Sequence, residues 1–454
     1  MLPFANAGGN PDTEYLCDGI TESLINNLSR LPALRVVPRG LSFRYKGKDI
    51  DPRDLGRELH VRALLTGKVL QRGDTLSVQA ELVDVECECQ LWGQRYNRKA
   101  ADIFELEEEI ALQISENLRL RLTGEEKEKL VRRSTENSQA YHLYLKGRYH
   151  WSKRTDEGLK KGIQYSELAI RMDPGYALAY AGLADCHAVL TFYSTAPPKQ
   201  EWEKAWAAAR KALELDDQLA EAHATMGVIR SLSDHQWAEG EKELFRATDL
   251  DAGSWLAQDY LAIILAAQGK YEEAGVRIER AQKLEPLSLV VHHHAGIIYN
   301  LARRYDRAIE HSLRALEMEP NYFVAFYWLG LAYQQKSMPA QALEAFRKAV
   351  DYSERNPSAL PMLIHACAAS GHRAEALKLL EELNGIARRR YVEPFNMALL
   401  YAGLDEPDRA FDRLDQAYDD RSSWLALFVN GDPRLDRLRP QPRFHNLLRR
   451  MRLA

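Results

Sequence analysis

The sequence predicts a mainly α-helical protein, in which a long solenoid of paired helices follows a small N-terminal α/β domain with a mixed sheet. The chain has 454 residues and is therefore too long for one ordinary hydrophobic core. Its C-terminal two-thirds repeats a pattern of small and aromatic residues with a period of 34. A different pattern, in which apolar residues alternate with polar ones, is confined to residues 1–124 and predicts the separate domain.

The repeat is clearest between Pro286 and Pro320, which lie 34 residues apart. Gly296 and Gly330 occupy the same place in successive units, where a small residue lets the first helix of a unit approach the second. The proline ends the second helix because it lacks an N–H and restricts the residue before it. These demands are steric, so the recurrence of residue size predicts a stack of helical pairs.

Counting from the third residue after each proline, eight units fit the pattern. They begin near Ala140, Ala177, Ala220, Trp255, Leu289, Phe323, Ala359 and Val392. This pattern resembles the tetratricopeptide repeat family, and the resemblance implies a superhelical array with an inner groove. We expect the array to span 140–425, with an insertion at 191–202 in the second unit. The arginine-rich segment 426–454 is expected to cap its end.

The N-terminal domain mixes strand and helix periodicities. Three segments with alternating apolar residues are expected to form strands, at 61–69, 76–82 and 90–97. Three segments with helical spacing are expected to form helices, at 16–31, 52–59 and 103–122. A tight turn at 72–74 joins the first two of these strands, and a linker at 125–139 leads into the array. The expected order is β-α-β-α-β-β-β-α.

Three stretches of this domain carry a second resemblance. They are MLPFANAGGNPDTEYLCDGITESLINNLSRLPALRVVPRGLSFRYKGK, LLTGKVLQRGDTLSVQAELVDV and QLWGQRYNRKAADIFELEEEIA. They resemble the TolB amino-terminal-like domain of bacterial signalling proteins. In that family the domain is joined to tetratricopeptide repeats and often follows a serine/threonine kinase, a nucleotide cyclase or a winged-helix domain. Family members begin the first strand earlier, so we expect a longer parent protein or a start codon placed late.

The composition favours a soluble chain without a strongly basic surface. Lys and Arg number 61 and Asp and Glu number 65, giving a formal charge of -4. This balance argues against the basic face that nucleic-acid binding requires. No stretch approaches the roughly 20 apolar residues that span a bilayer. We expect a cytoplasmic protein, or a periplasmic one if the chain belongs to a longer membrane-anchored protein.

The five cysteines do not form a recognisable site. They stand at positions 17, 87, 89, 186 and 367, without a CxxC pair or a Cys/His set of zinc-site spacing. We expect all five to be reduced, buried thiols.

The sequence also lacks the common catalytic motifs. Gly8-Gly9 matches neither GxxxxGK[ST] nor GxGxxG, and neither GxSxG nor HExxH is present. Consecutive residues on a helix point about 100° apart, so His292, His293 and His294 cannot aim at one metal ion. We expect His292 and His294 to face neighbouring helices and His293 to face the groove. The sequence therefore predicts no catalytic site, no cofactor and no metal.

The repeat numbering places positions 2, 5, 9 and 12 of each first helix on the concave surface. The candidate partner-binding residues at these positions are Tyr144, Arg148, Asp185, Asp259, Ile263, His293, Ile297, Asn300, Tyr327, Leu331 and Gln334. The Lys, Arg and Asn set that clamps the C-terminal carboxylate of chaperones in some tetratricopeptide proteins is absent. A largely apolar groove suits an amphipathic helix or an extended apolar segment. The chain's own N-terminal domain and its final helix are also candidate occupants.

These observations predict a non-enzymatic scaffold or regulatory module that binds a protein or peptide segment in the groove. The alternative is the ligand-sensing regulatory half of a larger signalling protein, in which the repeats relay a signal to a kinase, a cyclase or a transcription factor. A third alternative is an enzyme, for which no constellation of residues is visible.

Overall fold

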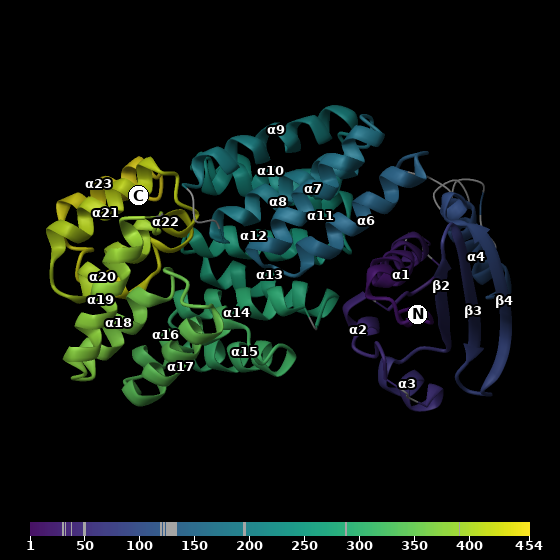
Figure 1. Cartoon of the computed structure of the whole chain (residues 1–454), viewed down its shortest axis with the longest axis horizontal. Coiled ribbons are helices and arrows are strands. Elements are labelled where there is room, and N and C mark those ends of the chain that lie inside the picture. The colour runs from purple at the N-terminus through teal and green to yellow at the C-terminus, as the bar shows by residue number, and fades with distance from the viewer. Residues whose placement is uncertain are drawn as a thin grey trace. The chain divides into compact units, whose positions relative to one another are not determined.

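The computed structural model describes residues 1–29, 31, 33–37, 39–48, 51–118, 120, 123, 134–193, 197–286, 288–389 and 391–454. The chain divides into two compact units, Met1–Gly182 and Leu183–Ala454. The first unit contains the sheet and the first helical pair, and the second contains most of the helical array (Figure 1).

A four-stranded mixed sheet forms the core of the N-terminal domain. Its strands are β1 (Ala5–Asn6), β2 (Ala63–Arg72), β3 (Thr75–Asp84) and β4 (Cys89–Lys99). They lie in the order β1-β2-β3-β4, with β1 parallel to β2 and the other pairs antiparallel. Arg72 pairs with Thr75 across the hairpin turn. The predicted mixed sheet and the turn at 72–74 are confirmed.

Helices pack against this sheet. The α-helices of the domain are α1 (Glu14–Ser29), α2 (Arg39–Phe43), α3 (Pro52–Leu59) and α4 (Ile103–Asn117), and short 3-10 turns span Pro11–Thr13 and Ala100–Asp102. Ile20 on α1, Val78 on β3 and Ile110 on α4 are fully buried in one core. The helix predicted at 103–122 ends at Asn117, and residues 119, 121 and 122 lie outside the described residues.

One predicted strand is absent from the described residues. The expected order places a strand between α1 and α3, but the described residues of that connection, including 33–37, contain no strand. Leu34 and Val36 instead pack by their side chains against the core. β2 is already paired on both sides, by β1 and β3, so no edge of that strand is left for this segment.

The prediction of five buried thiols is wrong for two of them. Cys87 and Cys89 form a disulfide in the exposed connection between β3 and β4. Glu88 between them has a left-handed backbone, with φ 55°, which turns the chain so that the two sulfur atoms meet. Cys17, Cys186 and Cys367 are free and buried, as predicted.

Eight helical pairs follow in the described part of the chain. The pairs are α6 (Ser138–Ser152) with α7 (Asp156–Met172), α8 (Ala177–Tyr193) with α9 (Lys199–Leu215), α10 (Ala220–Leu232) with α11 (Trp237–Leu250), α12 (Trp255–Ala267) with α13 (Tyr271–Leu284), α14 (Leu289–Leu301) with α15 (Tyr305–Met318), α16 (Phe323–Gln335) with α17 (Pro339–Tyr352), α18 (Leu360–Ala369) with α19 (Arg373–Ala387), and α20 (Pro394–Gly403) with α21 (Pro407–Asp419). Each pair starts within two residues of the start that the repeat pattern predicts. The solenoid of paired helices is confirmed.

The small residue has the predicted steric role in two of the first helices, α10 and α16. A Cβ atom built on Gly227 would lie 2.6 Å from Leu244, and one built on Gly330 would lie 2.8 Å from the Phe346 ring. Both contacts are shorter than real Cβ atoms allow, so the two helices of these pairs approach closely only because glycine has no side chain.

The insertion predicted at 191–202 covers the end of α8, the connection and the start of α9. Helix α8 continues to Tyr193 and α9 starts at Lys199, while residues 194–196 lie outside the described residues. The helices α22 (Ser423–Phe428) and α23 (Pro442–Arg450) and a 3-10 turn, η3 (Pro433–Leu435), follow the last pair. Among the helices of the described residues, none is both long enough and apolar enough to cross a membrane.

The expected boundary at 124 and much of the linker at 125–139 fall on residues 124–133, which lie outside the described residues. The boundaries of the domain, the array and the cap therefore stay predictions. Helix α6 packs against α1 of the sheet domain, where Leu145 would meet a Cβ atom on Gly19 at 2.6 Å. This packing explains why the first helical pair and the sheet domain share one compact unit.

Candidate interaction surface

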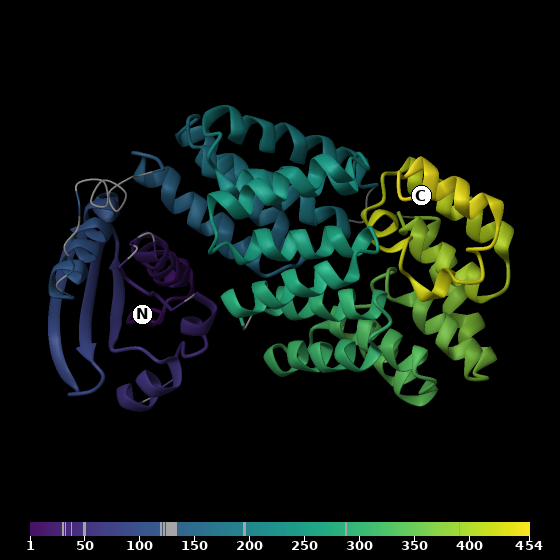
Figure 2. The same cartoon turned by 180° about the vertical axis from the view of Figure 1, so that it is seen from behind.

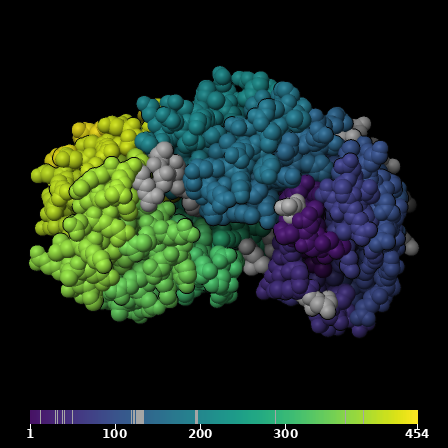
Figure 3. Space-filling model, in the orientation of Figure 1, coloured from purple at the N-terminus to yellow at the C-terminus, as the bar shows by residue number. Residues whose placement is uncertain are grey.

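In the second unit the first helices of successive pairs pack side by side, and we call the face that they form, from α8 to α20, the inner surface. The chain's own C-terminal part packs against this surface. We call residues 421–439 the return segment, because they turn back from α21 onto the array. Helix α22 packs against α10 and α12. In Figures 1 and 2 it lies beside the ends of these helices. Figure 3 shows the yellow C-terminal residues next to the teal residues near position 200.

Aromatic side chains hold the centre of the return segment. Phe428 is 1% exposed. Its ring centroid lies 4.9 Å from that of Trp328 on α16, 5.4 Å from that of Trp424 and 6.3 Å from that of Phe395 on α20. Such ring pairs contribute stability beyond their buried area. Phe428 therefore joins helices from two pairs that are separated in the sequence.

Hydrogen bonds fix the start of the return segment to the second pair. The indole Nε1–H of Trp202 donates to the carbonyl oxygen of Arg421 at 3.1 Å, and the hydroxyl of Ser423 donates to Thr191 Oγ1 at 2.6 Å. Trp202 is fully buried. These contacts span more than 200 residues of sequence, so the array closes on itself inside the second unit.

A buried ion pair lies within the return segment, and its arginine also contacts the array. Arg434 Nη2 lies 2.6 Å from Asp432 Oδ2, and the two side chains are 7% and 0% exposed. Arg434 also donates to the Tyr327 hydroxyl at 2.9 Å. Burial lowers the pKa of the Arg434 guanidinium, but Asp432 and Tyr327 outweigh burial and raise it above its ordinary value. Asp436 pairs with Arg303 at 2.8 Å, which ties the segment to the end of α14.

A buried carboxyl group lies at the base of the return segment. Glu393 Oε1 accepts the hydroxyl of Ser422 at 2.6 Å, and the same hydroxyl oxygen accepts the backbone N–H of Leu425 at the start of α22. Glu393 also accepts the backbone N–H of Phe395 and so begins α20. Burial raises the pKa of Glu393 to about 7. One carboxyl group thus anchors both the last helical pair and the segment that follows it.

A second buried carboxyl group lies in the first unit. Glu107 on α4 accepts the hydroxyl of Ser23 on α1 at 2.6 Å and the hydroxyl of Tyr141 on α6 at 3.1 Å. Burial raises the pKa of Glu107 to about 7. This carboxyl group links two helices of the sheet domain to the first helix of the array.

Most of the predicted groove residues are buried by contacts within the chain. The buried ones are Asp185, Asp259, Ile263, Ile297, Asn300, Tyr327 and Leu331, and the half-buried ones are Tyr144, Arg148, His293 and Gln334. Tyr144 and Arg148 belong to the first unit and the other nine to the second. Their part in partner binding stays a prediction.

The polar groove residues of the second unit contact neighbouring helices. Asp185 accepts the hydroxyl of Thr225 at 2.8 Å and that of Tyr260 at 3.2 Å. The Asn300 amide donates to the carbonyl oxygen of Trp328 at 3.3 Å, and Gln334 lies 2.9 Å from the ring nitrogen of His365. These contacts hold successive first helices together.

In the first unit, the Tyr144 ring packs edge-on against Tyr176, with centroids 5.4 Å apart. The Arg148 guanidinium lies 4.2 Å from the centroid of the Trp151 ring. Both candidate residues therefore lie against aromatic side chains of their own unit.

The three consecutive histidines point in different directions. His292 lies 3.2 Å from the ring nitrogen of His311 on α15, and His294 lies 2.7 Å from Asp259 on α12, so both face neighbouring helices as predicted. His293 lies beside Tyr322, with ring centroids 5.7 Å apart. No group of three or more His, Cys, Asp or Glu side chains able to hold a metal ion occurs within the described ranges.

Sequence reasoning missed the return segment as an occupant of the inner surface. The sequence offers the final helix as a candidate occupant, whereas α22 and η3, which precede that helix, contact the array. The signal was the apolar run 424–428, which is too short for a repeat helix and too apolar for a solvated cap.

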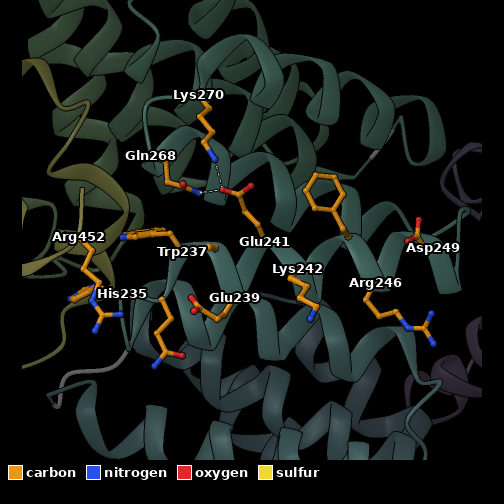
Figure 4. A pocket seen from close by; sticks show the side chains of 13 residues that line it. His235, Trp237, Glu239, Glu241, Lys242, Arg246, Asp249, Gln268, Lys270 and Arg452 are labelled. Carbon is orange, nitrogen blue, oxygen red and sulfur yellow. Dashed lines mark hydrogen bonds and ion pairs between the residues drawn. The ribbon is translucent and has the colours of Figure 1, made fainter. Parts of the chain in front are cut away.

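A separate depression lies on α11 and the loop before α13 (Figure 4). Its volume is about 810 Å³. Lys242, Arg246 and Arg452 line it together with Glu239 and Asp249, and Figure 4 shows these side chains around the opening. Charges of both signs line the depression, so its chemistry favours no single class of ligand.

Comparison with known families supports the prediction that the helical pairs are tetratricopeptide repeats. Residues 324–356 match the family model described as tetratricopeptide repeat. The helical pairs are tetratricopeptide repeats. Residues 1–112 match a different model, described as the second domain of HilA/YgeH-like transcriptional regulators. The resemblance of the N-terminal domain to the TolB amino-terminal-like domain stays a prediction.

One curated relative is a protein named putative adenylate cyclase 3 from Rhizobium meliloti (strain 1021). It is 32% identical over 234 residues, which cover 51% of this chain and 40% of the relative. The chain thus spans less than half the length of that relative.

Solved tetratricopeptide structures give distant likenesses. YrrB, described as a TPR protein with an unusual peptide-binding site, is 23% identical, with 43% of this chain and 95% of YrrB covered and a TM-score of 0.30. The APC/C hetero-tetramer Cut9-Hcn1 is 14% identical, with 77% and 63% covered and a TM-score of 0.47.

Proposed function

We propose that this chain is the non-enzymatic, protein-binding and regulatory part of a larger signalling protein. The observation that carries the proposal is the return segment. The inner surface of the repeats already holds one stretch of polypeptide through aromatic rings, a hydrogen bond from Ser423 to Thr191 and a hydrogen bond from Arg434 to Tyr327. A surface with this chemistry suits a protein or peptide partner, which is also the usual role of tetratricopeptide repeats.

The half-buried part of the inner surface is the best candidate for contact with a partner in the second unit. His293 on α14 lies there beside Tyr322, and Val290 one turn earlier is also half-buried. Ile297 and Tyr327 are less suitable for testing, because both are buried and Tyr327 accepts a hydrogen bond from Arg434. Substitution of either would disturb the fold before it disturbed a partner.

The test is photocrosslinking of the full chain in its native cells, with a photoreactive amino acid at position 293. The matched control carries it at position 313, because Leu313 on α15 is 42% exposed on a second helix of a pair. We expect a discrete protein adduct at position 293 that the control lacks. The same adducts at both positions, or none at position 293, would contradict binding on the inner surface.

The signalling role rests on two supporting likenesses. The N-terminal 112 residues match a domain of transcriptional regulators, and half of the chain is 32% identical to part of a protein named as a putative adenylate cyclase. We infer that the chain regulates such a catalytic or DNA-binding partner. The Glu107 contacts with Ser23 and Tyr141 support this inference, because they couple the sheet domain mechanically to the first repeat helix.

Two measurements test this role. An in-frame cyclase, kinase or DNA-binding domain in the genomic sequence upstream of Met1 would support it, and an upstream region that encodes an unrelated protein would count against it. The purified chain should form no cyclic nucleotide from ATP. Formation of cyclic nucleotide would overturn the non-enzymatic assignment.

A further inference from the structure

The exposed cysteines of this protein lie at the turn from β3 into β4. Cys17, Cys186 and Cys367 are at most 1% exposed. Burial raises the pKa of the Cys17 thiol to about 12 and that of the Cys367 thiol to about 11, which keeps both protonated and unreactive. Cys87 and Cys89 are exposed and bonded to each other. All five cysteines belong to the described residues. Among them, solvent therefore reaches the sulfur atoms of Cys87 and Cys89 and not those of the other three.

The disulfide bridge adds little to the stability of the fold. It joins residues that are two apart in the sequence, and the stability that a disulfide adds through chain entropy is smallest for the shortest loops. The turn is also held without it. The Asp84 carboxylate accepts the backbone N–H groups of Glu86 and Cys87 at 2.9 and 3.3 Å. The two strands pair along ten residues of β3. A stabilising role therefore does not explain the bridge.

The bridged turn is coupled to its neighbour α3. Glu88 has a φ of 55°, a left-handed conformation that is unfavourable for a residue with a side chain. Its carboxylate lies 2.8 Å from Arg53 on α3. Val85 fills the space over Gly56 on the same helix, where a Cβ atom would lie 2.5 Å from a valine methyl. A change in the turn must therefore alter the contacts of α3.

We propose that Cys87 and Cys89 form a thiol–disulfide exchange site for soluble thiols of the glutathione class. Exposed disulfides exchange readily, whereas buried ones do not. A thiolate attacks one sulfur of the bridge, forms a mixed disulfide and releases the other cysteine as a thiolate. A second thiol then attacks the glutathione sulfur of the mixed disulfide and releases the remaining cysteine. The bridge gains two electrons and two protons, and two thiols become one low-molecular-weight disulfide.

Reduction changes the turn and its contact with α3. Without the bridge, Glu88 is free to leave the left-handed region, and its ion pair with Arg53 loses the fixed backbone that positions it. The outcome is a reversible change in the mobility of residues 85–89 and of α3, while the rest of the sheet keeps its hydrogen-bonded ladder.

The test uses the full chain without denaturant, equilibrated in buffers of different ratios of reduced to oxidised glutathione. Accessible thiols are counted with Ellman's reagent after rapid removal of glutathione, and intact mass is recorded. We expect the count to rise from none to two per chain as the ratio rises and to return to none when it falls. The variant Cys367→Ser should give the same curve, and Cys87→Ser should show one accessible thiol or one glutathione adduct throughout.

Amide hydrogen exchange of the same samples tests the consequence. Reduction should speed exchange in 85–89 and in α3, and the double variant Cys87→Ser with Cys89→Ser should match the reduced protein under every buffer. Two accessible thiols at every ratio would show that the bridge does not form. No accessible thiol before unfolding would show that it does not exchange. Either result overturns the proposal, as does an exchange pattern in α3 that reduction leaves unchanged.

Discussion

Glu107 and Glu393 are buried carboxyl groups at points where separate parts of the chain meet. Burial raises the pKa of each from its ordinary value of 4.5 to about 7. Because the folded protein holds the proton more tightly than the unfolded chain, each group contributes stability that is complete below pH 4.5. That contribution is lost as the pH rises through 7. The protein should therefore be less stable at pH 9 than at pH 6 through these two residues.

The variant Glu107→Gln should be more stable than the wild-type protein at pH 9. The amide cannot ionise, and its oxygen still accepts the hydroxyls of Ser23 and Tyr141. The difference between a pKa of 4.5 and one of about 7 corresponds to at most roughly 3 kcal/mol at high pH. Thermal unfolding of both proteins from pH 5 to pH 9 measures the difference, which should shrink towards zero at pH 5.

The matched control for this prediction is Glu105→Gln, because Glu105 is exposed on the same helix. It should leave the pH dependence of unfolding as it is in the wild-type protein. If Glu107→Gln destabilised the protein equally at pH 5 and pH 9, the carboxylate would be a required ionised partner, and the reasoning from burial would be wrong.

At the scale of helices, close contact within a pair depends on glycine. The variant Gly330→Ala should lower the free energy of unfolding by about 1–3 kcal/mol, because its Cβ atom would lie 2.8 Å from the Phe346 ring. Gly275→Ala is the matched control on helix α13, where a Cβ atom meets nothing within 4 Å. It should stabilise the protein by ~0.5–1 kcal/mol. Denaturant unfolding measures both, and equal effects would contradict the steric account.

The buried ion pair of the return segment leads to a prediction about charge. Asp432→Asn should cost about 3–5 kcal/mol, because it leaves the buried Arg434 guanidinium without its carboxylate. Arg437→Gln breaks a pair whose side chains are 76% and 86% exposed, and should cost ~1 kcal/mol or less. Denaturant unfolding of the single variants compares the two pairs.

A double variant separates the charge from the shape of the Asp432 site. Asp432→Asn combined with Arg434→Met removes the uncompensated charge and keeps most of the side-chain volume. It should be more stable than Asp432→Asn alone. A double variant that loses as much stability as the two single variants together would show that the pair does not act through its charge.

The helical elements were predictable because their signal recurs. Pro286 and Pro320 give the period, and Gly296 and Gly330 give the face on which the two helices pack. Because the same pattern recurs in every unit, each unit supports the prediction of the others. Elements that occur once lack that support. Leu34 and Val36 are residue types that often occur in strands. A strand also needs a neighbouring strand with a free edge, and the local sequence does not show whether one is available.

The candidate site was predictable only in part for a related reason. The repeat numbering predicts that Asp185, Asn300 and Tyr327 line the groove, and the structure places each of them against another part of the chain. The contact of Tyr327 with Arg434 joins residues 107 positions apart. Such pairs depend on how far the array curves, which the period does not determine. The Cys87–Cys89 bridge was missed because its geometry comes from one left-handed residue between the two cysteines.

At the scale of the second unit, closure changes how stability is shared. In an open array each repeat contacts only its neighbours, so a local defect spreads little along the chain. Here α22 follows the last pair in sequence but packs against α10 and α12 of the third and fourth pairs. Trp237 on α11 also donates to the carbonyl oxygen of Met451 at 2.8 Å. The ends of the array should therefore unfold together.

The variant Phe428→Ala tests this closure. It removes a fully buried ring from α22 and should cost about 3–5 kcal/mol. Because α22 bridges to the earlier pairs, amide hydrogen exchange should rise in α10 and α12 as well as in α20. Phe411→Ala is the matched control, since Phe411 is also buried but lies on α21 beneath the Arg443 side chain. Its effect should stay in the last pair and α23. If both variants raised exchange only in the last two pairs, the return segment would be a simple cap and the array would be open.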